Sequence, residues 1–139
     1  MRQLPESVRI QVLFQHEVLR ALLGRLVHAS ERILRGDPAA QQLRDAQRTL
    51  HDVLEVHLRQ EEDVLAPLLR ATCGPERRDR MHADHCRALR ALERQVGRPP
   101  RQSASASRRL ALRMLAAMEA EERELMGSAP RPEAQMSLH

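Results

Sequence analysis

A chain of 139 residues is long enough for one domain with a modest core, and its composition narrows the choice of fold. Hydrophobic residues make up 42% of the chain but aromatic residues only 1%, and Phe14 is the single example. A core of leucine, valine, alanine and methionine favours helices over sheets. No run approaches the length of a membrane span, and the N-terminal stretch lacks the apolar region of a signal peptide. We therefore expect a cytoplasmic protein with no membrane partner.

The basic charge of the chain does not indicate a nucleic-acid partner. The formal net charge is +4, the isoelectric point is about 10.7, and all 23 basic residues are arginines. These arginines are scattered among aspartates and glutamates, which is typical of a solvated helix surface. With almost no aromatic side chains to stack on bases, we expect no binding of nucleic acid. The same surface indicates no particular oligomeric state.

Helix-ending residues divide the first half of the chain into two predicted helices. The first spans about residues 5–35 and ends at Gly36, since glycine suits the position after a helix. Asp37 is the expected N-cap of the second helix and Pro38 its first residue. This second helix is predicted to run to about residue 72 and to bend near Pro67.

The second half of the chain contains two more predicted helices. The third begins at Pro75 and ends near Val96, and the segment 97–107 is predicted to be the longest loop. A serine near the end of that loop caps the fourth helix, which ends by Met126. The predicted domain is thus an all-α, antiparallel up-down-up-down four-helix bundle over residues 1–126, followed by a disordered tail over 127–139.

The second helix carries two ionisable residues on its apolar side, His57 and Glu61. Residues three, four and seven apart share one face of a helix, and that face also carries Leu50, Leu54 and Val64. Burying a carboxylate without a partner costs several kcal/mol, roughly, so such groups are paired or bind a metal. This segment alone leaves both readings open: a buried His–Glu pair within the helix, or a metal site.

The other three helices also place a potential metal ligand on the apolar face. These residues are His16 in the first helix, His85 in the third and Glu122 in the fourth. Three imidazoles and two carboxylates that converge inside one bundle suit iron, manganese or zinc. The five residues together favour a metal site more strongly than any one of them alone.

Four segments carry a resemblance to a known family. They are "FQHEVLRALL" in the first helix, "HLRQEEDVLAPLL" in the second, "HADHCRAL" in the third and "MEAEEREL" in the fourth. In these segments the chain resembles the hemerythrin-like (HHE cation-binding) family, whose members are four-helix bundles with a non-haem di-iron centre. The resemblance covers roughly residues 8–126, and the second helix is its most specific part.

The resemblance implies a ligand set and a function. By it, His16 and His57 would bind one iron, His85 would bind the other, and Glu61 and Glu122 would bridge the two. Family members bind dioxygen reversibly, sense oxygen, nitric oxide or peroxide, or store iron, so dioxygen or nitric oxide is the expected small-molecule partner. No segment indicates a substrate pocket, and enzymatic turnover is not predicted.

Two departures from the family pattern affect the second metal position. Met118 stands where the family usually has a histidine before the last carboxylate, and Met81 stands four residues before His85. The first position therefore keeps its ligands while the second has lost imidazoles, so a single iron or a zinc ion is an alternative to two irons. His82 could compensate, although a rim position suits it better, and Met118 is predicted to pack in the core.

Three alternatives compete with the di-iron prediction. The main one is a degenerate bundle that binds one metal or none and acts as an interaction module. Another is a haem protein with Met118 and a histidine as axial ligands, although the leucine-rich faces indicate no space for a haem. The ferritin-like carboxylate class is set aside because it needs Glu-x-x-His on two helices, and this chain has no such motif.

The remaining polar residues are assigned simpler roles. His28 and His51 lie off the ligand-bearing faces and are predicted to be solvated. Arg20, one turn after His16, is predicted to be solvated, or to neutralise Glu61 or Glu122 if the site holds no metal.

The two cysteines are not predicted to form a disulfide. Cys73 falls at a helix end and Cys86 about ten residues into the next helix, which places them roughly 15–20 Å apart. Reduced thiols fit a cytosolic protein.

Overall fold

The structure, a computed structural model, describes the backbone of residues 6–60 and 75–125, and their side chains except those of 8, 75–81, 124 and 125. Within these ranges all regular structure is helical: α1 (Glu6–Leu34), α2 (Ala40–Gln60), α4 (Pro75–Glu93) and α5 (Pro100–Leu125). The all-α prediction is confirmed for this part of the chain. The predicted continuation of the second helix over 61–72 and the predicted tail lie outside the described residues.

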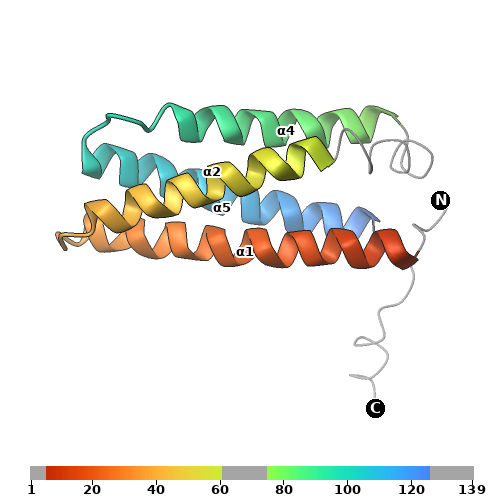
Figure 1. The fold of residues 1–139 in the computed structure, drawn as a ribbon, viewed down its shortest axis with the longest axis horizontal. Helices are drawn as coiled ribbons and strands as arrows, with labels where there is room; N and C mark the ends of the chain where they lie inside the picture. Colours follow the sequence, from red (N-terminus) through yellow and green to blue (C-terminus); the bar gives the residue numbers. More distant parts are fainter. Residues whose placement is uncertain (1–5, 61–74, 126–139) are drawn as a thin grey trace, which may run out of the picture.

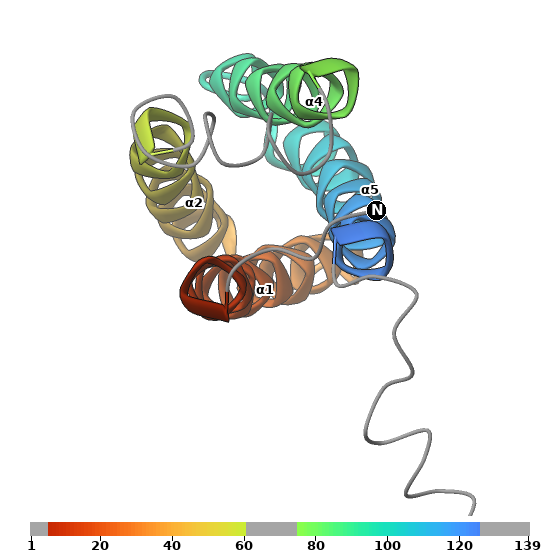
Figure 2. The same cartoon turned by 90° about the vertical axis from the view of Figure 1, so that its right-hand side faces the viewer.

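The four helices lie side by side along the long axis of the molecule (Figure 1). Viewed end on, they surround a common interior (Figure 2). α1 packs against α2 and α5, α2 also packs against α4, and the contact of α4 with α5 is slighter. The connections from α1 to α2 and from α4 to α5 both lie at the left end of Figure 1. No helix in the described ranges has an apolar stretch long enough to traverse a bilayer.

Along α1 and α5, a line of buried positions recurs at alternating intervals of three and four residues. A mean spacing of 3.5 residues places side chains along one seam, the geometry of helices packed in near alignment. On α1 the buried seam consists of Val12, His16, Leu19, Leu23, Leu26, Ser30 and Ile33. On α5 it consists of Ala104, Ser107, Ala111, Met114, Met118 and Glu121. Polar residues therefore occupy seam positions in an otherwise aliphatic core.

The end of α1 follows from one glycine. Gly36 has a φ of 96°, a left-handed conformation that glycine adopts without steric cost. The N–H of Asp37 donates to the carbonyl of Arg32, and the N–H of Gly36 donates to that of Ile33, both at 2.9 Å. This pattern satisfies carbonyl groups that the helix end would otherwise leave unpaired. The predicted end of the first helix is confirmed, and α2 begins at Ala40, two residues later than predicted.

The fourth helix begins earlier than the sequence suggested. Residues 100–107 were predicted to belong to a loop, but α5 starts at Pro100, a residue favoured in the first turn of a helix. Ser103 and Ser107 are buried within the helix, and the Nε2 of Gln47 donates to both hydroxyls, at 2.7 and 2.9 Å. The intrinsic cost of serine in a helix is only a few tenths of a kcal/mol, roughly, which these contacts outweigh.

The third helix ends earlier than predicted. α4 stops at Glu93, whereas its predicted end was Val96. The chain then tightens, since the N–H of Gln95 donates to the carbonyl of Leu92 at 3.0 Å. Gly97, with a φ of 80°, completes the change of direction before α5.

Candidate metal centre

Four buried polar residues, one from each helix, lie in the half of the bundle away from the α1–α2 connection. They are His16 on α1, His57 on α2, His85 on α4 and Glu121 on α5, with exposed fractions of 2%, 6%, 5% and 7%. Placing ionisable groups in an aliphatic core is costly unless they are paired or bind a cation. The cluster therefore requires an explanation beyond packing.

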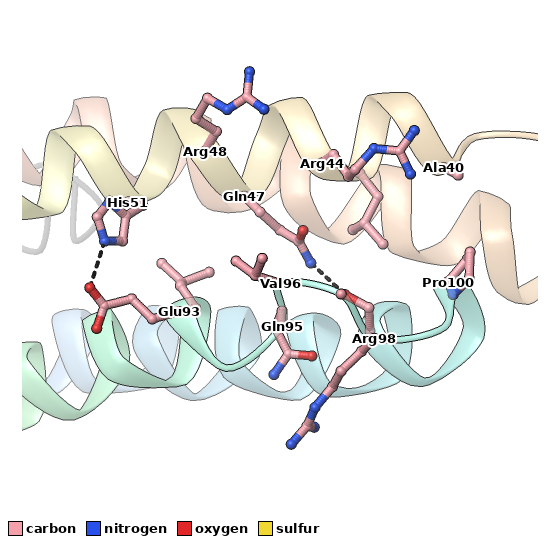
Figure 3. Close-up of a pocket in the computed structure, with 14 residues that line it drawn as sticks. Ala40, Arg44, Gln47, Arg48, His51, Glu93, Gln95, Val96, Arg98 and Pro100 are labelled. Carbon is pink, nitrogen blue, oxygen red and sulfur yellow. Dashed lines mark hydrogen bonds and ion pairs between the residues drawn. The ribbon is translucent and has the colours of Figure 1, made fainter.

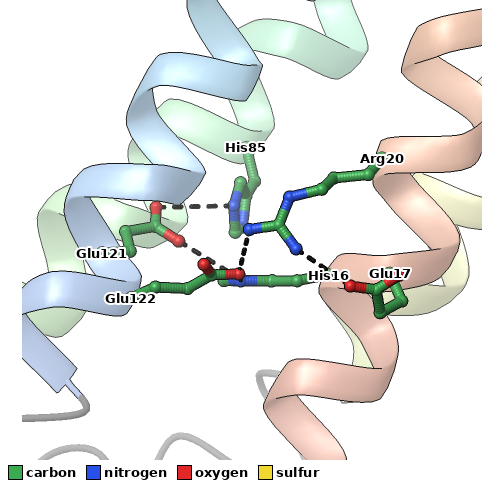
Figure 4. Close-up of polar contacts among 6 residues, drawn as sticks. All are labelled: His16, Glu17, Arg20, His85, Glu121 and Glu122. Atoms are coloured by element: carbon green, nitrogen blue, oxygen red, sulfur yellow. Dashed lines mark hydrogen bonds and ion pairs between the residues drawn. The ribbon is translucent and has the colours of Figure 1, made fainter. Parts of the chain in front are cut away.

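The carboxylate of Glu121 lies between two of the imidazoles. Its Oε2 is 3.6 Å from Nε2 of His16, and its Oε1 is 3.9 Å from Nε2 of His85 (Figure 4). The ring of His85 also meets the ring of His57 edge to face, with centroids 4.9 Å apart and planes at 69°. The two oxygens of Glu121 thus face His16 on α1 and His85 on α4, and His57 on α2 adjoins His85.

Glu122 lies outside this group and contacts the other side of His16. Its Oε1 accepts a hydrogen bond from Nδ1 of His16 at 2.9 Å and another from Arg20 (Figure 4). Arg20 also reaches Oε1 of Glu17, at 3.3 Å. Of the two expectations for Arg20, the structure shows the pairing with Glu122 and not the fully solvated side chain. A carboxylate that fixes the far nitrogen of a histidine is a common partner of metal-binding histidines.

The electrostatics favour a neutral His16 and an ionised Glu122 at neutral pH. Burial lowers the pKa of His16 below its ordinary value of 6.5, and the hydrogen bond with Glu122 only partly opposes this shift. Burial raises the pKa of Glu122, but the hydrogen bonds from Arg20 and His16 outweigh it and lower that pKa below its ordinary value. A carboxylate only accepts hydrogen bonds, so the proton of neutral His16 lies on Nδ1 and Nε2 keeps its lone pair.

The chemistry of these donors fits a metal ion. The lone-pair nitrogen of His16 and the Oε2 of Glu121 are both acceptors, and they face each other at 3.6 Å inside the protein. Both atoms are of the kind that binds a cation, and imidazole with carboxylate suits iron, manganese or zinc. Within the described ranges no three histidine, cysteine or acidic side chains converge tightly enough to form a complete metal-binding group. Glu61, the ligand predicted from the second helix, lies outside those ranges.

Met118, which stands where the resemblance implies a histidine, is a core residue. Met118 is 1% exposed and belongs to the main hydrophobic cluster, as predicted. The side chain of Met81 lies outside the described residues. His82 is half-buried, with its Nε2 3.5 Å from Sγ of Cys86, and Cys86 is a free thiol. Cys73 lies outside the described part of the chain.

The two histidines predicted to be solvated differ in the structure. His28 is exposed, as expected. His51 is not, because its side chain is only 25% exposed and its Nε2 lies 3.1 Å from Oε2 of Glu93 on α4. The hydrogen bond with Glu93 is the main reason that the pKa of His51 is raised above its ordinary value. The partner is remote in sequence, so the helical pattern of α2 alone did not reveal it.

Glu121 is a residue of this buried cluster that the sequence analysis did not select. Its neighbour Glu122 was chosen because it lies four residues after Met118, as Glu61 lies four after His57. The buried positions of α5 alternate by four and three, and the step from Met114 to Met118 is a step of four. The next seam position is therefore three residues on, at Glu121.

The comparison with family models assigns the chain to a family. The family model described as the hemerythrin HHE cation binding domain matches residues 11–127, a span that includes nearly all of the four helices. No curated protein and no solved structure gives a significant match to the chain.

Proposed function

The chain belongs to the hemerythrin HHE cation-binding domain family, and we propose that its cation site is the interior cluster of His16, His57, His85 and Glu121. One observation carries the proposal: the two oxygens of Glu121 face Nε2 atoms of two different histidines, at 3.6 and 3.9 Å. Imidazole with carboxylate suits iron. From the family resemblance we propose that these residues would hold two non-haem irons within an antiparallel up-down-up-down bundle.

The proposed ligands divide between the two positions as the family resemblance suggests. By the resemblance His16 and His57 would hold one ion and His85 the other, with Glu121 as the carboxylate of the site; in the structure the ring of His57 adjoins that of His85. Glu61 is the further carboxylate that the resemblance suggests. Glu122, the residue nominated from sequence, is proposed instead to position His16, because its contacts are with Nδ1 of that ring and with Arg20.

Bound iron would supply open coordination positions for dioxygen or nitric oxide and one-electron redox chemistry. The chain itself would keep water from the site. Leu19, Leu54 and Met118 lie three residues from His16, His57 and Glu121 respectively, and each is at most 1% exposed. This aliphatic layer is suited to binding or sensing a small apolar gas rather than a polar substrate.

The second metal position is proposed to be the weaker one. It has His85 and a share of Glu121, whereas Met118 supplies only a buried thioether where the family has an imidazole. Thioethers suit soft ions better than ferric iron. Stepwise binding is therefore expected, with the His16–His57 position filled first.

Anaerobic titration with ferrous iron tests the proposal in matched variants. His16→Ala and His28→Ala remove histidines from the same helix, one buried in the cluster and one exposed. His16→Ala is expected to weaken binding of the first ion at least about tenfold, because a ligand is lost, and His28→Ala to bind as the wild type does. His85→Ala is expected to lower the stoichiometry to one.

Two outcomes would count against the proposal. If the folded wild type binds no ferrous iron, the degenerate bundle becomes the better account. If His16→Ala and His28→Ala bind iron equally well, the metal lies elsewhere in the chain.

A further inference from the structure

A second line of regularly spaced residues runs along the outer face of α1, on the side away from the buried seam. Its positions alternate by four and three residues, the mean spacing that lets two helices pack along their length. In the end-on view no other helix of the described ranges covers this side of α1 (Figure 2). We call this line the outer seam, and all of its members are exposed: Ile10, Phe14, Glu17, Ala21, Gly24 and His28.

The first half of the outer seam is bulky and apolar. Phe14, the single aromatic residue of the chain, is 68% exposed, and Ile10 is 60% exposed. The polar member, Glu17, is paired with Arg20 of the same helix at 3.3 Å. Exposed apolar side chains that adjoin one another in this way are typical of a surface that binds a partner.

The second half of the outer seam borders a hollow of about 460 Å³ between α1 and α2. Ala21 and Gly24 line it, and a Cβ added at Gly24 would meet no atom of another helix within 4 Å. Arg25 and His28 line it as well. These four residues of α1 occur at i, i+3, i+4 and i+7, the set that forms the hole for a side chain of a facing helix in a coiled coil. The hollow is therefore shaped to receive a side chain from a helix.

The two halves of the outer seam are complementary when two α1 helices run antiparallel. Phe14 and Gly24 lie equally far from Leu19 along the helix, on either side of it. A two-fold axis at the level of Leu19 thus places Phe14 of each copy opposite Gly24 of the other. The same axis brings Glu6, in the acidic first turn of α1, level with Arg32 in the basic last turn. Large side chains then face small ones, and acidic residues face basic ones.

We propose that the outer seam of α1 binds the outer seam of a second copy of this chain, in an antiparallel two-fold dimer. Phe14 of each copy inserts into the hollow of the other, between Ala21 and Gly24. Arg25 lines that hollow and offers a cation to the face of the aromatic ring. A lipid surface would account for the exposed Phe14 but not for the helical spacing or the matching hollow. The dimer does not depend on the proposed metal centre.

Another hollow of similar size has no such seam beside it. It has a volume of about 430 Å³ and lies between α2 and the connection from α4 to α5 (Figure 3). Val96 lines it and is 84% exposed, but α4 has already ended at Glu93, so Val96 belongs to no helical seam. Val96 is therefore a matched control for Phe14, as an exposed apolar residue beside a hollow.

Sedimentation equilibrium of the full chain, over a range of micromolar concentrations, tests the proposal. We expect a reversible equilibrium between monomer and dimer for the wild type. Phe14→Glu should weaken association at least about a hundredfold, because each dimer loses two equivalent aromatic contacts. Val96→Glu introduces the same charge and should associate as the wild type does. Circular dichroism checks that each variant keeps its helices.

Filling the hollow tests the orientation of the two copies. Gly24→Leu should keep the fold, because the added side chain meets open space and leucine favours a helix more than glycine does. It should weaken association about tenfold or more, since Phe14 of the second copy no longer fits. The double variant with Phe14→Ala and Gly24→Leu should recover association, because the large and small side chains have exchanged places.

Several results would overturn the proposal. A wild type that stays monomeric at millimolar concentration excludes the dimer, and this includes a monomer that binds phospholipid vesicles through Phe14. Equal losses in Phe14→Glu and Val96→Glu, or a loss in Val96→Glu alone, would place the interface elsewhere. Undiminished association of Gly24→Leu, or no recovery in the double variant, would refute the antiparallel insertion of Phe14 into the hollow.

Discussion

Replacing each of two adjacent glutamates by glutamine distinguishes a residue that binds the metal from one that positions a ligand. In the proposed site Glu121 would supply oxygen atoms to the metal, whereas Glu122 holds Nδ1 of His16. Glutamine keeps the size of either side chain and removes the charge. Glu121→Gln and Glu122→Gln should therefore weaken metal binding by different amounts.

The size of the Glu122→Gln effect follows from its contacts. Glu122 accepts hydrogen bonds from His16, at 2.9 Å, and from Arg20, and its side chain is 18% exposed. A charge-assisted hydrogen bond contributes about 1.5–3 kcal/mol, and a neutral one about half as much. The amide oxygen can still accept from His16, so the expected loss is about 1–1.5 kcal/mol, or roughly tenfold in affinity. This agrees with the losses of about 10–100-fold seen when outer partners of metal ligands are changed.

Competition with a chromophoric chelator measures both affinities. Glu121→Gln should lose far more than tenfold, because a ligand charge is removed from the site itself. Glu119→Gln, an exposed glutamate on the same helix, is the control and should match the wild type. The reasoning is refuted if Glu121→Gln binds metal as the wild type does while Glu122→Gln loses binding altogether.

Three further predictions concern the metal count and the stability of the bundle. Met118→His should raise the occupancy of the second metal position, as measured by elemental analysis after iron loading; unchanged occupancy contradicts the two-ion geometry. Gln47→Ala leaves the fully buried hydroxyl of Ser107 without its donor and should lower the free energy of unfolding, measured in urea, by about 1–3 kcal/mol. Gln42→Ala, at an exposed position of α2, is the control and should lower it much less. Burial lowers the pKa of His16 in the folded state, so the unfolded chain binds more protons than the folded chain below about pH 6.5. The free energy of unfolding of the metal-free protein should therefore fall as the pH drops through that range. A free energy of unfolding that does not change with pH there would contradict this prediction.

The sequence predicted the helices best where a local signal defines them. Gly36 ends α1 by adopting a positive φ. This depends on a single residue being glycine, so the residue type alone predicts the helix end. The start of α5 was mispredicted because serines read as loop residues, whereas Ser103 and Ser107 are held in a helix by Gln47 from another helix. Such contacts between distant segments leave no periodic trace in the sequence.

The same distinction explains which buried polar residues the sequence predicted. His16, His57 and His85 were expected in the interior because each lies on an aliphatic face of its own helix, and all three are buried. The choice between Glu121 and Glu122 was harder, since neighbouring residues on a helix differ by only about 100° and the seam advances by three or four residues in turn. The pairing of Arg20 with Glu122 was named only as an alternative, because it joins α1 to α5.

The metal content of the full chain is the decisive test of the proposed site. It is measured by elemental analysis of protein purified without chelators or a metal-affinity tag and then offered ferrous iron anaerobically. We expect iron bound at up to two ions per chain, with the first ion lost in His16→Ala. Protein that is fully helical and still binds no metal would contradict it.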